Sequence, residues 1–472
     1  MGVTVLAAVL GFLHLGDKPL AQDEATSWFI AQLDWSGLWE AVTTSEANAG
    51  IYYGLLHFWI TFGESEVALR TLSVLCGIAT IPVLYALGIR LFDRIPALIG
   101  SVLLAVNAFF IENVQDARGY SMATLLITTA SYLFVRLLWQ PSKGRTVAYV
   151  LLSVLAVYAH FFAVLVIGAH VLSLAFVRRD EIPFRSLLPA YAAMGLLIAP
   201  LVGFSLTNDV GQIAWISDPT WTRLMDGLKD LTGRGGIPVL VGYGVAFVLG
   251  VAAAIRARRS GRSSFDGWRY AFLFLWVFVP IAVSFGFSYI KPIFEPRYLM
   301  GVMPAIALLG AAGLWVIRVR VIPIAAVALA MVPAAQAVDD WYDTGAVRWA
   351  AGVRQIVQNT EPRDGMVFYA PTMLRPYLYY AERLGVEEDF PEFIYPTSYE
   401  WLGFSRTRYH PDYEAIRQRA EQHGRVWLVK GKEADEPRRE EAALLRDTLA
   451  GACPEIVGEL FKARIVLYGG CS

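Results

Sequence analysis

Residues 67–92 read VALRTLSVLCGIATIPVLYALGIRLF, an almost unbroken apolar run that decides the fold. A helix needs about 20 mostly apolar residues to cross the hydrocarbon core of a bilayer. This stretch exceeds that length and contains only two charged residues, Arg70 and Arg90. The run therefore predicts a membrane-spanning helix.

Similar apolar runs lie on both sides of it, and we expect eleven spanning helices in all. Residues 147–177 are too long for one helix and are divided near His160. Residues 3–15 lack a basic leader and a small-residue cleavage site, so we interpret them as a spanning helix and not as a signal peptide. The other predicted spans are 95–111, 120–139, 187–206, 236–255, 270–290, 298–317 and 321–338.

The composition agrees with a membrane protein. The 472 residues are 56% hydrophobic and only 17% charged, which is more apolar than a soluble core requires. The net charge is −1, and the charges cluster between the apolar runs, so no basic field for nucleic acid exists. We expect an all-α polytopic membrane protein whose partners are lipids and sugars.

The charges in the loops predict an orientation. Short cytoplasmic loops carry an excess of Lys and Arg. If the N-terminus is cytoplasmic, the inner loops hold fourteen basic residues and four acidic ones, whereas the outer loops before residue 339 hold seven and fifteen. We therefore expect a multi-pass protein of the inner (plasma) membrane with a cytoplasmic N-terminus and an extracytoplasmic C-terminal tail.

The chain turns polar at residue 339 and predicts a small α/β domain. Its candidate strands are 366–370, 426–429 and 464–468, and its candidate helices are 347–359 and 436–449. We thus divide the chain into a transmembrane catalytic domain at 1–338, whose first outer loop is 17–66, and an extracytoplasmic domain at 339–472. Within that loop, residues 34–41 predict a surface helix that Trp35, Leu38 and Trp39 anchor to the membrane.

The three cysteines form no CxxC-type metal-binding pattern. Cys453 and Cys471 flank the last apolar segment, and a disulfide between them and two separate thiols remain equally open. The acids Asp23, Glu24, Glu46 and Asp116 hold a divalent metal only if they converge. We expect no obligatory cofactor and leave a divalent metal open.

Two carboxylates, Asp23 and Glu24, directly follow the first predicted span. A carboxylate near a low-dielectric boundary can have a raised pKa and can take a proton from an acceptor hydroxyl. Acids in the first turn of a helix also serve as caps, so the pair alone leaves both interpretations open.

A dense polar patch, ENVQDARGY, occupies the short outer turn at residues 112–120. Asp116, Arg118 and Tyr120 favour the lining of a cavity, because charged groups beside the hydrocarbon are costly. Arg118 is suited to binding phosphate. An ion pair between Asp116 and Arg118 that merely closes the turn is the alternative.

Another tight outer turn, SYIKPIFEPRYL at 288–299, holds Lys291, Arg297 and Tyr298. The two cations suit the phosphate of a polyprenyl lipid whose tail stays in the bilayer. Snorkelling at helix ends is the alternative for both. His160 lies at the tip of a helical hairpin, where a lone histidine is more often an interfacial residue than a ligand.

Four motifs in this order resemble bacterial members of glycosyltransferase family 39, which has the GT-C fold. They are DEATSWFIAQ, EANAGIYYGLLHFW, SEVALRTLSVLCGIATIPVLYALGIRLFDR and NAFFIENVQDARGYSM. Relatives include protein O-mannosyltransferases and the aminoarabinose transferases that act on lipid A. The resemblance covers about residues 20–180, with an echo in IFEPRYLMGVMPAIALL, and leaves the tail almost unmatched.

The resemblance implies an inverting, mannosyltransferase-like transfer from a polyprenyl-phosphate sugar. Asp23 matches the proposed catalytic aspartate and Glu24 a supporting neighbour, while Asp116 and Arg118 match a motif that shapes the donor site. Ala47 and Asn48 replace a basic residue and a proline that often follow the acid at Glu46 in relatives, and Thr26 stands where some carry arginine. Donor phosphate binding is therefore assigned to Arg118, Arg297 and Lys291. Sugar binding is assigned to Glu46, Asn48, Tyr52, Asp116, Tyr120, His160 and Tyr298.

We accordingly expect a glycosyltransferase that acts on an extracytoplasmic glycan, glycolipid or protein of the cell envelope. A transporter or flippase of lipid-linked sugars predicts charges in mid-helix and repeated halves, and the sequence contains neither. A ligase that moves a whole lipid-linked glycan uses similar outer arginines and stays open. An inactive scaffold also stays open. The sequence does not define the sugar or the acceptor.

Overall fold

The structure is a computed structural model that describes residues 1–44, 46–207, 216–260, 264–343, 349–369, 374–386, 391–396, 412–430, 436–460 and 465–471. The chain separates into two compact units. The first contains the described residues of 1–15, 46–209 and 216–344, and the second contains those of 16–45 and 345–472. The part of the first outer loop that precedes residue 46 therefore belongs to the same unit as the tail.

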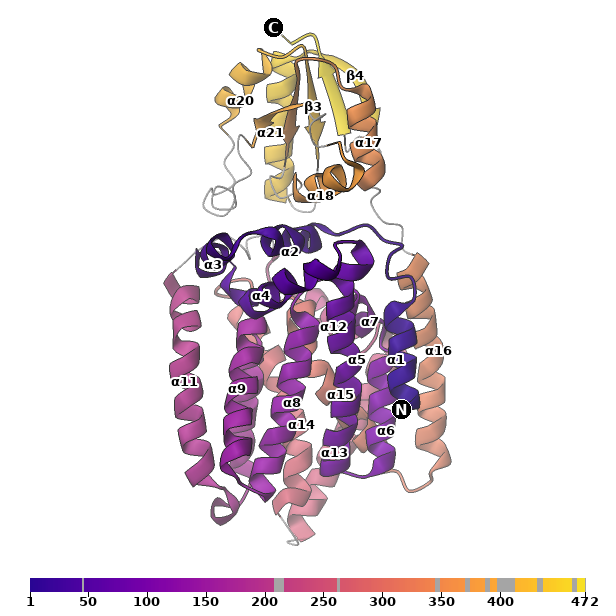
Figure 1. The fold of residues 1–472 in the computed structure, drawn as a ribbon. Helices are drawn as coiled ribbons and strands as arrows, with labels where there is room; N and C mark the ends of the chain where they lie inside the picture. The colour runs from indigo at the N-terminus through magenta and orange to yellow at the C-terminus, as the bar shows by residue number, and fades with distance from the viewer. Residues whose placement is uncertain are drawn as a thin grey trace. The chain divides into compact units, whose positions relative to one another are not determined.

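The first unit is a bundle of helices (Figure 1). Its α-helices are α1 Gly2–Phe12, α4 Gly50–Trp59, α5 Glu66–Leu91, α6 Arg94–Ala105, α7 Ala108–Val114, α8 Tyr120–Trp139, α9 Lys143–Ala159, α10 Ala163–Ser173, α11 Phe184–Thr207, α12 Trp221–Leu231, α13 Gly236–Ser260, α14 Ser264–Phe287, α15 Met303–Trp315 and α16 Val321–Asp343. Its 3-10 helices are η1 Ala47–Ala49, η2 Ile60–Phe62, η3 Leu174–Phe176, η4 Arg179–Glu181 and η5 Pro296–Val302.

All eleven predicted spans fall on helices, but fewer helices are long and apolar enough to cross a membrane. Among the described residues there are seven, or eight if the bent pair of α6 and α7 is one span. The seven are α5, α8, α11, α13, α14, η5 with α15, and α16. The helices α1 and α10 with η3 are apolar but shorter, and α9 has 17 residues.

The 63° bend between α6 and α7 has a local cause. Asn107 is the N-cap of α7, where its side-chain oxygen accepts a hydrogen bond from the Phe110 amide at 2.9 Å. Its Nδ2 donates to the carbonyl oxygen of Leu231, the last residue of α12, at 3.1 Å. The cap therefore starts a new helix and also ties that helix to α12.

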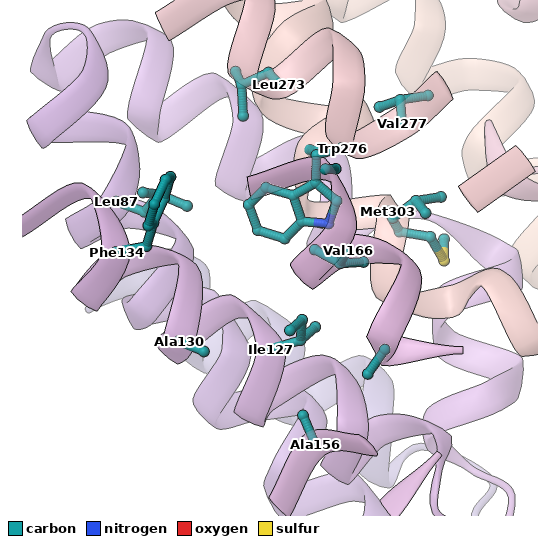
Figure 2. Packing of buried hydrophobic residues seen from close by; sticks show 14 of the residues in the cluster. Leu87, Ile127, Ala130, Phe134, Ala156, Val166, Leu273, Trp276, Val277 and Met303 are labelled. Carbon is teal, nitrogen blue, oxygen red and sulfur yellow. The ribbon is translucent and has the colours of Figure 1, made fainter. Parts of the chain in front are cut away.

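The core of the unit lies around α8, which packs against α5, α9, α10 and η5. Figure 2 shows Phe134 and Ile127 of α8 in one cluster with Leu273 and Trp276 of α14. The Trp276 indole donates to the carbonyl oxygen of Gly301 in η5 at 3.0 Å, which satisfies a buried polar group. This hydrogen bond ties the end of η5 to α14.

The second unit contains a five-stranded sheet with the order β2-β1-β3-β5-β4. Strand β1 pairs in parallel with β2 and β3, and β5 pairs antiparallel with β3 and β4. The elements of this unit are α2 Gln22–Gln32, α3 Trp35–Thr44, α17 Trp349–Asn359, β1 Asp364–Phe368, α18 Leu374–Leu384, β2 Glu392–Tyr395, α20 Tyr413–Ala420, β3 Arg425–Val429, α21 Glu436–Ala452, β4 Glu455–Leu460 and β5 Ile465–Gly469.

The two faces of the sheet are covered differently. Residues of α20 and α21 share a hydrophobic core with alternate residues of the strands. On the opposite face Phe368 of β1 contacts Tyr377 of α18, with 5.4 Å between ring centroids, and Trp349 of α17 contacts the same tyrosine at 5.3 Å. The predicted α/β domain is thus present, and β2, β4, α18 and α20 are elements that the sequence analysis missed.

Two expectations about this unit are resolved. Cys453 and Cys471 form a disulfide bond. The predicted surface helix is α3, in which Trp35 and Trp39 are 54% and 70% exposed. Leu38 is buried, so its prediction as a membrane anchor is wrong, because a buried side chain has no surface to place in a bilayer.

Candidate active site

The first candidate residues, Asp23 and Glu24, lie in the first turn of α2 in the second unit. The Glu24 side chain is buried, and its carboxylate accepts a hydrogen bond from the Ala21 amide at 2.8 Å. It therefore caps the helix, as the alternative interpretation required. Asp23 is half-buried in the same turn. Its catalytic role, like that of Glu24, stays a prediction.

Arg118 belongs to a chain of hydrogen bonds in the first unit. Its Nη1 donates to the hydroxyl of Tyr53 at 3.0 Å, and that hydroxyl donates to the Glu46 carboxylate at 3.0 Å. The amide of Arg118 also donates to the Asp116 carbonyl oxygen at 2.7 Å, which closes the turn through the backbone. The guanidinium is thereby held half-buried at the end of α7.

Two further predicted residues hold this turn in place. The Tyr52 side chain is completely buried, and its hydroxyl lies 3.2 Å from the hydroxyl of Ser73, which donates to the Arg118 carbonyl oxygen at 3.1 Å. The side-chain oxygen of Asn48 accepts from the amide of Phe161 at 2.6 Å. Both contacts are structural in this conformation, and Tyr52 presents no surface to a sugar.

Three rings meet at a pocket in the first unit. His160 lies 5.3 Å from Tyr120 and 5.1 Å from Tyr298, measured between ring centroids, and these two tyrosines are 6.1 Å apart. All three line the pocket together with Arg297. The rest of the lining is mainly apolar and comes from α8, α10, α14 and η5: Ala123, Ile127, Phe162, Ala163, Val166, Pro280, Leu299, Met300, Gly301 and Val302.

The imidazole of His160 is buried and neutral. Burial, with a smaller contribution from the positive charges of Arg118 and Arg297, lowers the pKa of His160 to about 3. Among the residues that the structure describes, no group makes a hydrogen bond with its buried Nε2. A ligand with a lone pair or a proton at this position would satisfy that nitrogen.

Arg297 is half-buried at the edge of the pocket, with its guanidinium carbon 5.9 Å from the centroid of the Tyr298 ring. The Glu295 carboxylate forms two ion pairs. Its Oε1 lies 3.8 Å from Nε of Arg297, and its Oε2 lies 3.3 Å from Nη2 of Arg223 on α12. Burial raises the pKa of the Glu295 carboxyl, an effect that both arginines oppose. Lys291 is exposed and does not line the pocket.

The remaining acid of the α7 turn has a structural partner. Glu112 forms an ion pair with Arg234, just after α12, and Arg234 also pairs with Asp230 at 2.8 Å. Gln115 donates to three carbonyl oxygens at the end of α1, the shortest contact being 2.8 Å to Leu13. These contacts fix α7 against α1 and α12.

Sequence reasoning missed Tyr53 and Arg223. Tyr53 lies seven residues after Glu46, a spacing that places two helical residues on one face, and this spacing is the signal that could have identified it. Arg223 belongs to a helix that the predicted spans omitted. No group of three His, Cys, Asp or Glu side chains with metal-binding geometry occurs in the described part of the chain.

Residues 53–204 match the family model described as dolichyl-phosphate-mannose-protein mannosyltransferase. No curated protein matches the sequence significantly. Among solved structures the chain is similar to ArnT from Cupriavidus metallidurans in the apo state, with a TM-score of 0.64 and 14% identity over 99% of this chain and 96% of that chain. For the same protein bound to undecaprenyl phosphate, the TM-score is 0.64 and the identity is 13%, over 99% of this chain and 97% of that chain.

A second similar structure is the archaeal oligosaccharyltransferase AglB from Archaeoglobus fulgidus, in complex with an inhibitory peptide and a dolichol-phosphate. Its TM-score is 0.51 and its identity is 12%, over 91% of this chain and 69% of that chain. At these identities the likeness concerns the fold.

Proposed function

We propose that this chain, which has the GT-C fold of the ArnT structures, transfers a sugar from a polyprenyl-phosphate donor to an extracytoplasmic acceptor. The observation that carries the proposal is the pocket where Arg297 and His160 meet an apolar wall, with the guanidinium carbon of Arg118 lying 5.9 Å from the ring centroid of Tyr120, which also lines it. Two cations and an unsatisfied ring nitrogen suit a phosphate, and the apolar wall suits a lipid tail. A similar fold that is bound to undecaprenyl phosphate supports this assignment.

We assign the donor phosphate to Arg118 and Arg297. Guanidinium groups can make two parallel hydrogen bonds to phosphate oxygens, and they stabilise the charge that develops on a leaving phosphate. The exposed Lys291 is the weaker candidate for this role. The faces of Tyr120 and Tyr298 are suited to stacking on a sugar ring. The polar contacts to the sugar are assigned to Glu46, Asn48 and Asp116.

In the proposed reaction the Asp23 carboxylate removes a proton from an acceptor hydroxyl. The hydroxyl oxygen attacks the anomeric carbon from the face opposite the phosphate and forms the new glycosidic bond. The bond between that carbon and the phosphate oxygen breaks, and its electron pair leaves with the polyprenyl phosphate. The anomeric configuration inverts.

We propose that the chain is in the inner (plasma) membrane with its N-terminus in the cytoplasm. The charges of the loops support this orientation. The disulfide between Cys453 and Cys471 also supports an extracytoplasmic tail, because disulfides persist in oxidising compartments. An extracytoplasmic site has no ready nucleotide sugar, which favours a lipid-borne donor. We assign the catalytic residues to 1–338, whose segment 16–45 belongs to the same unit as the tail.

The test is turnover in lipid nanodiscs with a panel of radiolabelled polyprenyl-phosphate sugars and a membrane extract as the source of acceptor. We expect one sugar to be consumed with release of polyprenyl phosphate. The Asp23→Asn variant should lose about two to four orders of magnitude in rate, the range for removing a general base. Glu40→Gln is the matched control, because Glu40 is an exposed acid on α3 in the same unit.

Two results would contradict the proposal. If only a complete lipid-linked oligosaccharide is consumed, the protein is a ligase. If labelled lipid crosses the bilayer without release of polyprenyl phosphate, it is a flippase. Equal activity of wild type and Asp23→Asn leaves the donor assignment intact and removes Asp23 as the base.

A further inference from the structure

An arginine of the tail reaches the helix that carries the candidate base. Arg375, in the first turn of α18, is only 6% exposed. Its Nη1 donates a hydrogen bond to the hydroxyl of Thr26 on α2 at 2.7 Å, and its guanidinium carbon lies 6.0 Å from the centroid of the Phe29 ring. Burying a charged guanidinium costs free energy, so the burial of Arg375 against α2 needs an explanation.

The contact between α18 and α2 extends along both helices. The hydroxyl of Tyr380 accepts a hydrogen bond from the Leu20 amide at 2.9 Å, just before α2 begins. Farther along, the ring of Tyr379 meets the edge of Trp28 at 5.1 Å between centroids. Because α2 is fixed over its length in this way, the guanidinium of Arg375 has a defined place beside it.

That place is one helical turn from Asp23. Residues three apart on a helix lie on the same side, with about 5–6 Å between their Cβ atoms, so Asp23 and Thr26 are neighbours on the surface of α2. A positive charge bound at Thr26 favours the ionised form of a nearby carboxylate. Only an ionised carboxylate accepts a proton from a hydroxyl group.

We infer that Arg375 is a positioning residue for Asp23, through which the tail domain completes the catalytic helix. This inference rests on the proposed function. Arg375 holds the acidic turn of α2 and places a positive charge about one helical turn from Asp23, and it contacts neither donor nor acceptor. The tail is then a part of the catalytic machinery although it contributes no group that touches the reacting atoms.

The first test compares Arg375→Met with Arg417→Met in the turnover assay, using the donor that wild type consumes. Methionine keeps an apolar stem for packing and removes the charge. Arg417 is the matched control, because it is an exposed arginine on α20 of the same unit that pairs with Glu421. We expect Arg375→Met to lower kcat about 10- to 100-fold with an unchanged KM for the donor, and Arg417→Met to behave as wild type.

The second test moves the guanidinium across the contact. The double variant Arg375→Thr with Thr26→Arg exchanges the two side chains. The positive charge then belongs to residue 26 on α2 and faces a threonine at residue 375 on α18. We expect it to recover at least about tenfold in kcat over Arg375→Met, and Arg375→Lys to recover part of the loss. A role in folding alone does not predict rescue of kcat at equal thermal stability.

The outcomes separate the inference from the function on which it rests. If wild type consumes no donor, the proposed function fails. If wild type is active and Asp23→Asn is not, while Arg375→Met keeps wild-type kcat, Arg375 is not a positioning residue. The inference also fails if the exchanged variant folds with wild-type stability and stays as slow as Arg375→Met. If Arg375→Met itself does not fold, the exchanged variant and Arg375→Lys are compared with wild type instead. The inference then fails if the exchanged variant folds with wild-type stability but its kcat is at least about tenfold below that of wild type.

Discussion

At the scale of single residues, short outer turns were the informative signal. Arg118, Tyr120, Arg297 and Tyr298 were predicted because charged and polar groups beside the hydrocarbon are costly unless they pair or line a cavity. Of these, Tyr120, Arg297 and Tyr298 line the pocket, and Arg118 does not. His160 was predicted only as a weak candidate, yet it lies at the pocket with a buried ring nitrogen that no described group satisfies. A one-dimensional pattern does not reveal burial of a histidine in a turn.

His160 leads to a prediction about stability and pH. Its pKa is about 3 in the folded chain and near 6.5 when the chain is unfolded. Between these values the unfolded chain binds more protons, so His160 makes the folded state less stable as the pH falls below about 6.5. We expect His160→Gln to lose less thermal stability between pH 7.5 and 5 than wild type loses.

The measurement is the unfolding temperature in detergent at several pH values. The control is His57→Gln, because His57 lies on α4 outside the pocket. This control should keep the wild-type dependence on pH. If His160→Gln shows the same dependence of unfolding temperature on pH as wild type, the His160 imidazole is not the buried group that causes the loss of stability.

At the scale of elements, the sequence identified the helices well and their contacts poorly. Long apolar runs predict α5, α8 and α14 because a bilayer requires helices of that length. Amphipathic α12 and tail helix α18 were missed, since they lack a long apolar run and their partners are distant in sequence. Arg375 was missed for the same reason, because Thr26 lies far from it along the chain.

Gly119 tests the fit between α8 and α9. A Cβ atom at this position would lie 2.7 Å from the carbonyl oxygen of Ala159, which precedes His160, and 3.3 Å from the Cβ of Tyr52. A backbone carbonyl cannot move away without shifting the end of α9. We expect Gly119→Ala to displace His160 from Tyr120 and to lower turnover at least about tenfold, with a lower unfolding temperature.

The matched control is Gly144→Ala on α9, where a Cβ would have no neighbour within 4 Å. Alanine is also the better helix former, so this variant should be as active and at least as stable as wild type. Wild-type turnover in Gly119→Ala would show that the close approach of the two helices is unimportant for the site.

At the scale of the whole molecule, the chain combines a helical unit that contains the pocket with a second unit that contains the acidic helix α2. The sequence predicted a membrane part and a polar tail, because composition changes near residue 339. It did not predict that residues 16–45 belong to the same unit as the tail. That grouping depends on contacts such as Thr26 with Arg375, which link the two ends of the chain.

We expect the pocket to bind a polyprenyl phosphate, which equilibrium binding of this lipid to the protein in nanodiscs measures. Each hydrogen bond to a charged group contributes about 1.5–3 kcal/mol, so Arg118→Met with Arg297→Met should weaken binding about a hundredfold or more. Arg178→Met, which removes an exposed arginine paired with Asp180, should bind as wild type. Equal affinity of the double variant and wild type would show that these two arginines do not hold the lipid phosphate.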